Sequence, residues 1–392
     1  MKSVVLTVLL GIVALACTGG TADPSTTTVV PGTTTTSAVA SSTSTSEMAT
    51  TTTTVAVSFP AFEFPDGPCQ LDGPLTQGEV TVLIGTTFYT LGPDNSAPRC
   101  LLEEVTSTDV RWNPTGTALI AGKTAVGDDF EYSYPLATDL SWTFPTGSSV
   151  VVFTTDQLWK VAVDDGTQTD ITFLAVTDAV AYHPAGEHLL AVGTDLSGQY
   201  GLWLATNQGT DPLLLAFDEG ATLSDPAWTW LGEPVFVAAH DDGVSHIHRV
   251  ELTSEGGFDG PIIVESDAPL DMLIPSPFDP IMLAYRTGGM SGESCVDGSH
   301  VAVSNVDVPE PLNSWTTSPV GWLPEERLLV LAYPDGCDSP ADLWSFSPGL
   351  CPGSVYGAFP VIAGVSGAAA RAPVPVPPPP PDFAGVIDPA PA

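Results

Sequence analysis

The sequence predicts an all-β protein built around a single β-propeller of six or seven four-stranded blades, with seven favoured. Two observations support this fold class. An aromatic residue, a turn and an apolar strand recur at intervals of 30 to 48 residues, most of them close to the roughly 40 to 50 residues of one blade. No stretch of 12 residues combines helical periodicity with helix caps.

The first repeated element is clearest in residues 112–116 (WNPTG) and 182–186 (YHPAG), each followed by an apolar strand. Weaker copies lie near residues 142, 228, 276 and 322, so that the six starts fall near residues 112, 142, 182, 228, 276 and 322. Each copy is typical of an antiparallel meander, because a turn with Pro and Gly joins two strand-like runs. The interval of 30 residues between the first two starts predicts a blade that lacks its outer strand.

A second element follows the first in three copies. The pairs are Leu158-Trp159, Leu202-Trp203 and Leu343-Trp344, and each Trp lies 17 to 22 residues after the preceding aromatic start. Two elements that recur at matching offsets indicate a true repeat, so the second Trp is expected in a further strand of the same blade.

The aromatic-x-Pro-x-Gly turn before an apolar strand resembles the blade motif of TolB-type and WD-repeat-like β-propellers over roughly residues 79–361. Residues 80–105 look like a blade without its first strand. A strand from residues 360–370 would complete it and close a ring of seven blades, so that no strand edge is left open. In the six-bladed alternative, these N-terminal strands complete the last blade.

The N-terminal residues predict export and lipid anchoring. Lys2 precedes an apolar run that is too short to span a bilayer, which is typical of an export signal in residues 1–16. The run Ala14-Leu15-Ala16-Cys17 resembles the lipobox of bacterial lipoproteins, which implies a lipid on Cys17 and a place in the cell envelope, outside the cytoplasm. The expected boundaries are a Ser/Thr-rich linker at 17–59, the propeller at 60–365 and a Pro-rich tail at 366–392.

The charge balance excludes one class of partner. The chain has 46 acidic and 9 basic residues and a net charge of −37. Nucleic acids and anionic headgroups require clustered Lys and Arg, so we expect no nucleic acid and attachment to a membrane through the lipid alone.

Five cysteines remain beside the anchor, in a compartment where disulfides persist: Cys69, Cys100, Cys295, Cys337 and Cys351. Two bridges and one free thiol are expected. Cys295 and Cys337 lie one blade period apart in equivalent polar turns, so they are the first choice of pair. A strand of about six residues would hold Cys337 about 20 Å from Cys351, too far for a bridge. Cys100 then pairs with Cys69 or with Cys351, and the sequence leaves both open.

One histidine group has metal-ligating residue types. If residues 241–244 form a four-residue turn, His246 and His248 share one face of a strand and His240 points to the other. The candidate metal site is therefore His246, His248 and Asp241.

No motif predicts catalysis. Residues 288–293 (GGMSGE) resemble a nucleophile elbow in part, but Glu293 replaces its last Gly and no helix follows. Enzymatic activity stays open, a protein without it is favoured, and no cofactor is expected. The loops that leave the first strands should surround one mouth of the channel, and their candidate ligand residues are His183, Glu233, Asp279, Glu325 and Glu326.

These features predict a binding or scaffold module for a protein, peptide or sugar ligand, with a cell-envelope protein, peptide or polysaccharide as partner. The alternative is a propeller hydrolase that acts on carbohydrate or ester substrates.

Overall fold

The computed structural model describes residues 58–65, 68–70, 79–92, 98–105, 107–216, 220–229, 231–252, 258–279, 281–289, 293–348 and 357–370. Cys17, the expected export signal at residues 1–16 and Cys351 lie outside these residues. The described residues form strands and one 3-10 helix, η1 (Pro324–Glu326). None of them forms a helix that is long and apolar enough to cross a membrane.

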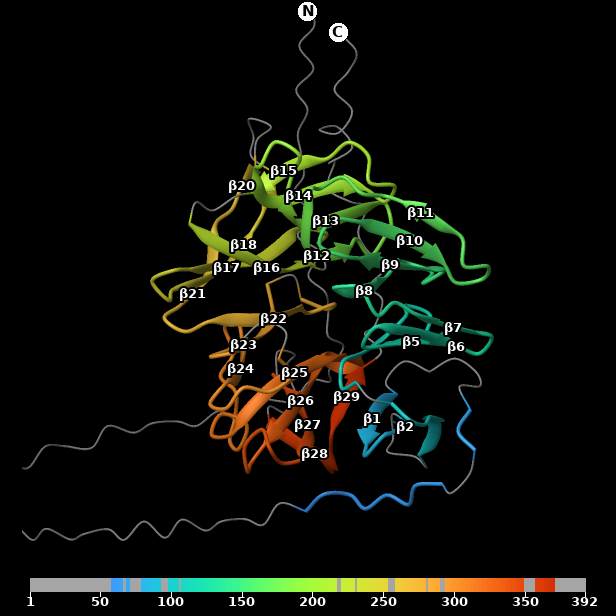
Figure 1. The fold of residues 1–392 in the computed structure, drawn as a ribbon. Coiled ribbons are helices and arrows are strands. Elements are labelled where there is room, and N and C mark those ends of the chain that lie inside the picture. The colour runs from blue at the N-terminus through green and yellow to red at the C-terminus, as the bar shows by residue number, and fades with distance from the viewer. Residues whose placement is uncertain are drawn as a thin grey trace, which may run out of the picture.

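Seven sheets follow one another around a common centre, and the last returns to lie beside the first (Figure 1). From the inner to the outer strand, blade 1 holds β29 (Gly367–Ala370), β1 (Val80–Ile84), β2 (Thr87–Leu91) and β3 (Arg99–Leu102); blade 2 holds β4 (Val110–Trp112), β5 (Ala118–Ala121), β6 (Thr124–Gly127) and β7 (Phe130–Ser133); blade 3 holds β8 (Asp139–Trp142), β9 (Ser149–Phe153), β10 (Leu158–Ala162) and β11 (Gln168–Asp170).

The remaining blades continue in the same order. Blade 4 holds β12 (Val176–Tyr182), β13 (His188–Thr194), β14 (Tyr200–Thr206) and β15 (Leu213–Ala216); blade 5 holds β16 (Ala221–Trp228), β17 (Pro234–His240), β18 (Ser245–Arg249) and β21 (Ile262–Ser266), with a small hairpin of β19 (Glu251–Leu252) and β20 (Phe258–Asp259); blade 6 holds β22 (Leu270–Pro275), β23 (Leu283–Thr287) and β24 (His300–Val303); blade 7 holds β25 (Thr316–Leu323), β26 (Arg327–Tyr333), β27 (Ala341–Ser347) and β28 (Gly357–Val365).

The all-β fold with seven blades is confirmed. Strand β29, from the C-terminal side, pairs antiparallel with β1 from Val80↔Ala370 to Leu83↔Gly367 and supplies the missing inner strand of blade 1. The six-bladed alternative is therefore wrong. The ring extends to residue 370, beyond the boundary expected at residue 365.

The number of strands differs from the expectation in two blades. Blade 2, which occupies the short interval between residues 112 and 142, keeps its outer strand and has four strands of three or four residues each. Short strands and tight turns, rather than a lost strand, explain the interval. Among the described residues it is blade 6 that has three strands.

The repeated aromatic residues hold neighbouring blades together. The indole N–H of Trp142 donates to the carbonyl of Arg111 at 3.0 Å, and that of Trp322 donates to the carbonyl of Ile274 at 3.0 Å. Trp228 donates in the same way to Ala181 at 3.2 Å. Each of these bonds joins the inner strands of two blades, so the aromatic repeat is explained by packing of the ring.

The second Trp of the repeat lies in the third strand of its blade, β10, β14 or β27, as the meander predicts. Trp344 is 1% exposed, and Phe59 packs edge-on against it with ring centroids 5.4 Å apart. Phe64 contacts Tyr89 of β2 at 4.6 Å. Residues 58–65, around the expected boundary between linker and propeller, therefore pack on blades 7 and 1, where the ring closes.

Two disulfides are present among the described residues. Cys295 and Cys337 are bridged with Cα atoms 5.7 Å apart, so the first choice of pair is confirmed. Cys100 is bridged to Cys69 with Cα atoms 4.6 Å apart, which decides between the two partners left open. The second bridge fastens the segment before β1 to β3, the outer strand of blade 1.

Candidate functional site

The inner strands carry a second repeat that precedes the aromatic one. A Thr-Asp or Ser-Asp pair stands just before, at the start of or within four inner strands, with its Asp three or four residues before the aromatic residue. These carboxylates are Asp109, Asp139, Asp178 and Asp225. Sequence reasoning missed them because it followed the turns after the aromatic residues, although the constant offset from those residues was a usable signal.

Two cavities lie at this end of the inner strands. The larger, of about 780 Å³, is bordered by β8, β12, β16 and β22, and the smaller, of about 500 Å³, by β4, β22, β25 and β29. Together they touch the inner strands of all seven blades, so they form the mouth of the central channel. Asp139, Asp178 and Asp225 line the larger cavity, and its lining residues in the described chain include no Lys or Arg.

β-Bulges shape the wall of this mouth. The pairing register shifts between Thr177 and Ala179 in β12, and equivalent shifts follow Ser224 in β16, Asp271 in β22 and Pro319 in β25. Two of the bulge residues, Asp225 and Met272, have positive φ angles of 49° and 52°. Bulges re-aim side chains and occur often beside functional sites, and positive φ at such residues costs about 1–3 kcal/mol each.

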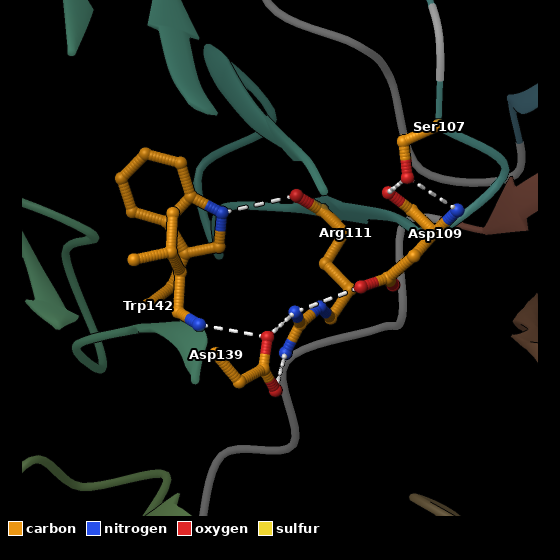
Figure 2. A network of polar contacts seen from close by, with 6 residues as sticks. Ser107, Asp109, Arg111, Asp139 and Trp142 are labelled. Carbon is orange, nitrogen blue, oxygen red and sulfur yellow. Dashed lines mark hydrogen bonds and ion pairs between the residues drawn. The ribbon is translucent and has the colours of Figure 1, made fainter. Parts of the chain in front are cut away.

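Arg111 joins two carboxylates at the smaller cavity, as Figure 2 shows. Its guanidinium donates to Oδ2 of Asp109 at 3.0 Å and to Oδ2 of Asp139 at 3.1 Å, with a second contact to Asp139 Oδ1. Burial lowers the pKa of Arg111, but the two carboxylates outweigh it and the pKa is raised. Arg111 thus links blades 2 and 3 and neutralises part of the charge on that side of the mouth.

A second arginine is buried below the mouth. Arg286 of β23 is 0% exposed, and its Nε donates to Asp271 Oδ1 at 2.8 Å while Nη2 donates to Oδ2 at 2.5 Å. Nη1 donates to Ser318 of β25 at 3.2 Å, which joins blade 6 to blade 7. A Cβ at Gly289 would lie 2.3 Å from Asp271 Oδ1, so this pair requires glycine there.

Two carboxylates of the larger cavity have raised pKa values. Burial raises the pKa of Asp178. Burial also raises the pKa of Asp225, with a further rise from Asp271, while the bond from Ser224 Oγ at 2.8 Å opposes it. A cation that enters the cavity would favour the ionised forms and interact with desolvated charge.

The ligand residues expected from sequence lie at the other end of the inner strands, and the described ones line neither cavity. Glu233 faces Arg249 of its own blade at 3.8 Å. Asp279 accepts a bond from the backbone N–H of Ile281 in its own turn at 2.9 Å. Glu326 ends η1 with φ of 59°, and the side chain of Glu325 lies outside the described residues.

His183 is a packing residue at this end. It is 1% exposed, its Nδ1 accepts a bond from the backbone N–H of Ala185 at 3.1 Å, and its ring stands edge-on to Trp228 with centroids 4.6 Å apart. Burial, with a smaller effect of His188, lowers the pKa of His183 to about 4. The ring is therefore neutral between blades 4 and 5 at physiological pH.

The histidine hairpin differs from the expectation by one residue of register. Ala238, and not Ala239, pairs with His246, so Phe236, Ala238 and His240 share a face with His246 and His248. The expectation that His240 points to the opposite face is wrong. Asp241 is exposed in the turn. The only trio of metal-ligating side chains that converges among the described residues is Cys69, Cys100 and Glu103, whose cysteines are bridged.

No family model and no curated protein matches the chain. Solved structures with a similar fold include TolB from Acinetobacter baumannii (14% identity, 75% of this chain and 67% of that chain, TM-score 0.42) and a puromycin hydrolase (13%, 79% and 57%, 0.48). An oligogalacturonate lyase in complex with manganese matches at 13% identity over 66% of this chain and 82% of that chain, with a TM-score of 0.43. The assignment of seven blades rests on the strand pairing itself.

Proposed function

We propose that this chain is an extracytoplasmic β-propeller, held at a membrane by a lipid on Cys17, that binds a basic peptide segment of a cell-envelope protein in the mouth of its channel. The observation that carries the proposal is the cavity of about 780 Å³, lined by Asp139, Asp178 and Asp225 and, in the described chain, by no basic residue.

Charge favours a cationic ligand at two ranges. The net charge of −37 attracts cations over about a Debye length, which speeds encounter and is weakened by salt. Inside the cavity, a lysine or arginine side chain would meet Asp178 and Asp225, whose pKa values burial raises. Apolar walls at Phe153, Leu270 and Leu273 can pack against the aliphatic part of such a side chain.

The cysteines support the proposed compartment. The disulfides Cys69–Cys100 and Cys295–Cys337 persist in an oxidising environment, which is consistent with a place outside the cytoplasm. The tether is tested directly. Cys17→Ser should release the protein into the medium or leave it unprocessed, and a processed variant that still fractionates with membranes would remove Cys17 from the proposal.

The binding test uses the mature full-length protein and two fluorescent peptides of equal length, one rich in Lys and one rich in Glu. The Lys-rich peptide should bind, and the triple variant Asp139→Asn, Asp178→Asn and Asp225→Asn should bind it at least about tenfold more weakly, since rim charges alone contribute little. Asp165→Asn, Asp170→Asn and Asp195→Asn together make the matched control, because they remove equal charge at exposed turns and strands. Equal losses in the two variants would contradict a site in the channel.

Hydrolysis is the second candidate function, since two carboxyls with raised pKa line one cavity, as in acid–base catalysis. A panel of glycosides and esters should be incubated with the wild type and with the same triple variant. Turnover that only the channel variant abolishes would replace the binding proposal with this one.

A further inference from the structure

Three of the six histidines of the chain gather on one face of blade 5. His240 ends β17, and His246 and His248 lie in β18 opposite Ala238 and Phe236. The rings touch in sequence, with centroids 5.0 Å apart for His240 and His246 and 5.6 Å apart for His246 and His248. In a chain so poor in histidine, such a cluster needs a physical reason.

His248 is supported by a backbone carbonyl, as many metal-binding histidines are. His248 Nδ1 lies 2.7 Å from the carbonyl oxygen of Gly260 and must donate to it, which leaves Nε2 as the basic nitrogen. Its ring also stacks on Phe236 with centroids 5.1 Å apart. A backbone carbonyl that fixes the tautomer of a histidine is the usual support of a metal ligand.

One nitrogen of each ring is buried: Nε2 of His240, Nδ1 of His246 and Nε2 of His248. His246 Nδ1 accepts and donates no hydrogen bond among the described atoms. A buried polar atom without a partner is costly and indicates a missing water or ion. The carboxylate of Glu265 completes the set, because Glu265 pairs directly with His246 across β18 and β21 and so stands on the same face.

We propose that His240, His246 and His248 bind a divalent transition-metal ion such as Zn²⁺, with Glu265 as the fourth ligand. Rings whose nitrogens share one tetrahedral metal at 2.0–2.1 Å have centroids roughly 5 Å apart, which matches both ring contacts. Imidazole with one carboxylate suits Zn²⁺, Cu²⁺ or Ni²⁺ rather than Ca²⁺ or Mg²⁺. The ion would tie β17, β18 and β21 together.

Binding requires a small rearrangement, because the nitrogens do not converge on one point in the metal-free arrangement. Rotation about χ2 of histidine meets a broad, shallow energy profile, so the rings of His240 and His246 can turn without moving the strands. His248 stays where Gly260 and Phe236 hold it. The site is separate from the channel, although Ala239, which precedes His240, lines the larger cavity. Its test is therefore independent of the proposed peptide binding.

The experiment titrates Zn²⁺ into chelator-treated, full-length protein by calorimetry, and Co²⁺ by visible absorption. We expect one ion per chain and a Co²⁺ spectrum typical of four-coordination. His246→Asn should weaken Zn²⁺ binding by at least about 100-fold, since even residues that only support ligands contribute 10- to 100-fold.

Asp241→Asn is the matched control, because Asp241 lies in the same hairpin and belongs to the ligand set that the sequence alone favours. It should leave the affinity unchanged. Glu265→Gln, at an exposed position, should weaken binding about tenfold. Thermal unfolding without metal checks that each variant is folded. The proposal would be overturned by the absence of saturable Zn²⁺ binding, by wild-type affinity in both His246→Asn and Glu265→Gln, or by a loss of affinity in Asp241→Asn.

Discussion

In four of the seven blades, two repeats with different physical roles lie a few residues apart along the inner strand. At one end the aromatic residues donate indole hydrogen bonds to the neighbouring blade and are buried, as Trp322 is with 1% exposure. At the other end, only three or four residues away, the aspartates border cavities and two of them have a raised pKa. The aromatic repeat, which is the more conspicuous in the sequence, therefore holds the ring together, while the aspartate repeat lines the mouth of the channel.

The largest effect should come from the aromatic end. Trp322→Ala removes a buried indole and its bond to the Ile274 carbonyl, so the free energy of unfolding should fall by about 3–5 kcal/mol. Trp322→Phe keeps most of the volume and loses only the bond, for about 1–3 kcal/mol. Urea unfolding measures both. Below the unfolding transition, each variant should bind the Lys-rich peptide with the affinity of the wild type. A loss of affinity in a folded variant would contradict the view that the aromatic end serves packing alone.

The next effect is a pH dependence at the same end. Because the pKa of His183 falls from its ordinary 6.5 to about 4 in the folded protein, the stability that its neutral form provides is complete above pH 6.5 and is lost as pH falls towards 4. The limit of this loss is about 3 kcal/mol. His183→Asn should remove most of it, since Asn113 holds the equivalent turn of blade 2 through its side-chain oxygen.

The measurement is the difference in unfolding free energy between the wild type and His183→Asn at several pH values from 7.5 to 4. The difference should shift in favour of the variant as pH falls. A constant difference would mean that the ring is solvated well enough to be protonated in the folded state. His183 would then resemble the aspartates at the other end of the inner strands and would not be a buried packing residue.

Much of the fold could be predicted from the sequence because its repeats reflect packing. The aromatic turns, the missing strand of blade 1 and the pairing of Cys295 with Cys337 all follow from a periodic core. The strand count of blade 2 was wrong because the length of an interval does not distinguish a lost strand from short ones. The face of His240 was wrong because one residue of register in the hairpin reverses every side chain of β17 relative to β18.

The candidate site was harder to predict than the fold. The loops at both ends of an inner strand are equally polar in sequence. The ligand site was expected at the end where the Pro-Gly turns lie, which is the end opposite the cavities. The cavities depend on bulges in β12, β16, β22 and β25, and no local residue pattern specifies these. Only the constant offset of the aspartates from the aromatic residues pointed to the correct end.

The smallest effect should come from the charged end and have the opposite sign. Because burial, and then Asp271, raise the pKa of Asp225, its favourable protonated form contributes stability that is complete below the unfolded pKa of about 3.9 and is lost as pH rises through the folded pKa. Asp225→Asn keeps the shape of the side chain, and Asn tolerates the φ of 49°. The variant should therefore be more stable than the wild type at pH 7, with a difference that shrinks towards pH 4.

Urea unfolding of wild type and Asp225→Asn at pH 4, 5, 6 and 7 checks the sign. Asp165→Asn is the control, because hydrogen bonds from Thr167 lower the pKa of Asp165 and its ionised form should favour the folded state at neutral pH. If Asp225→Asn is instead less stable at pH 7, Arg286 stabilises the carboxylate more than burial penalises it, and Asp225 belongs with the buried pair of blade 6. If Asp225→Asn gains stability and binds the peptide more weakly, the carboxylate of Asp225 costs folding stability but contributes to ligand binding.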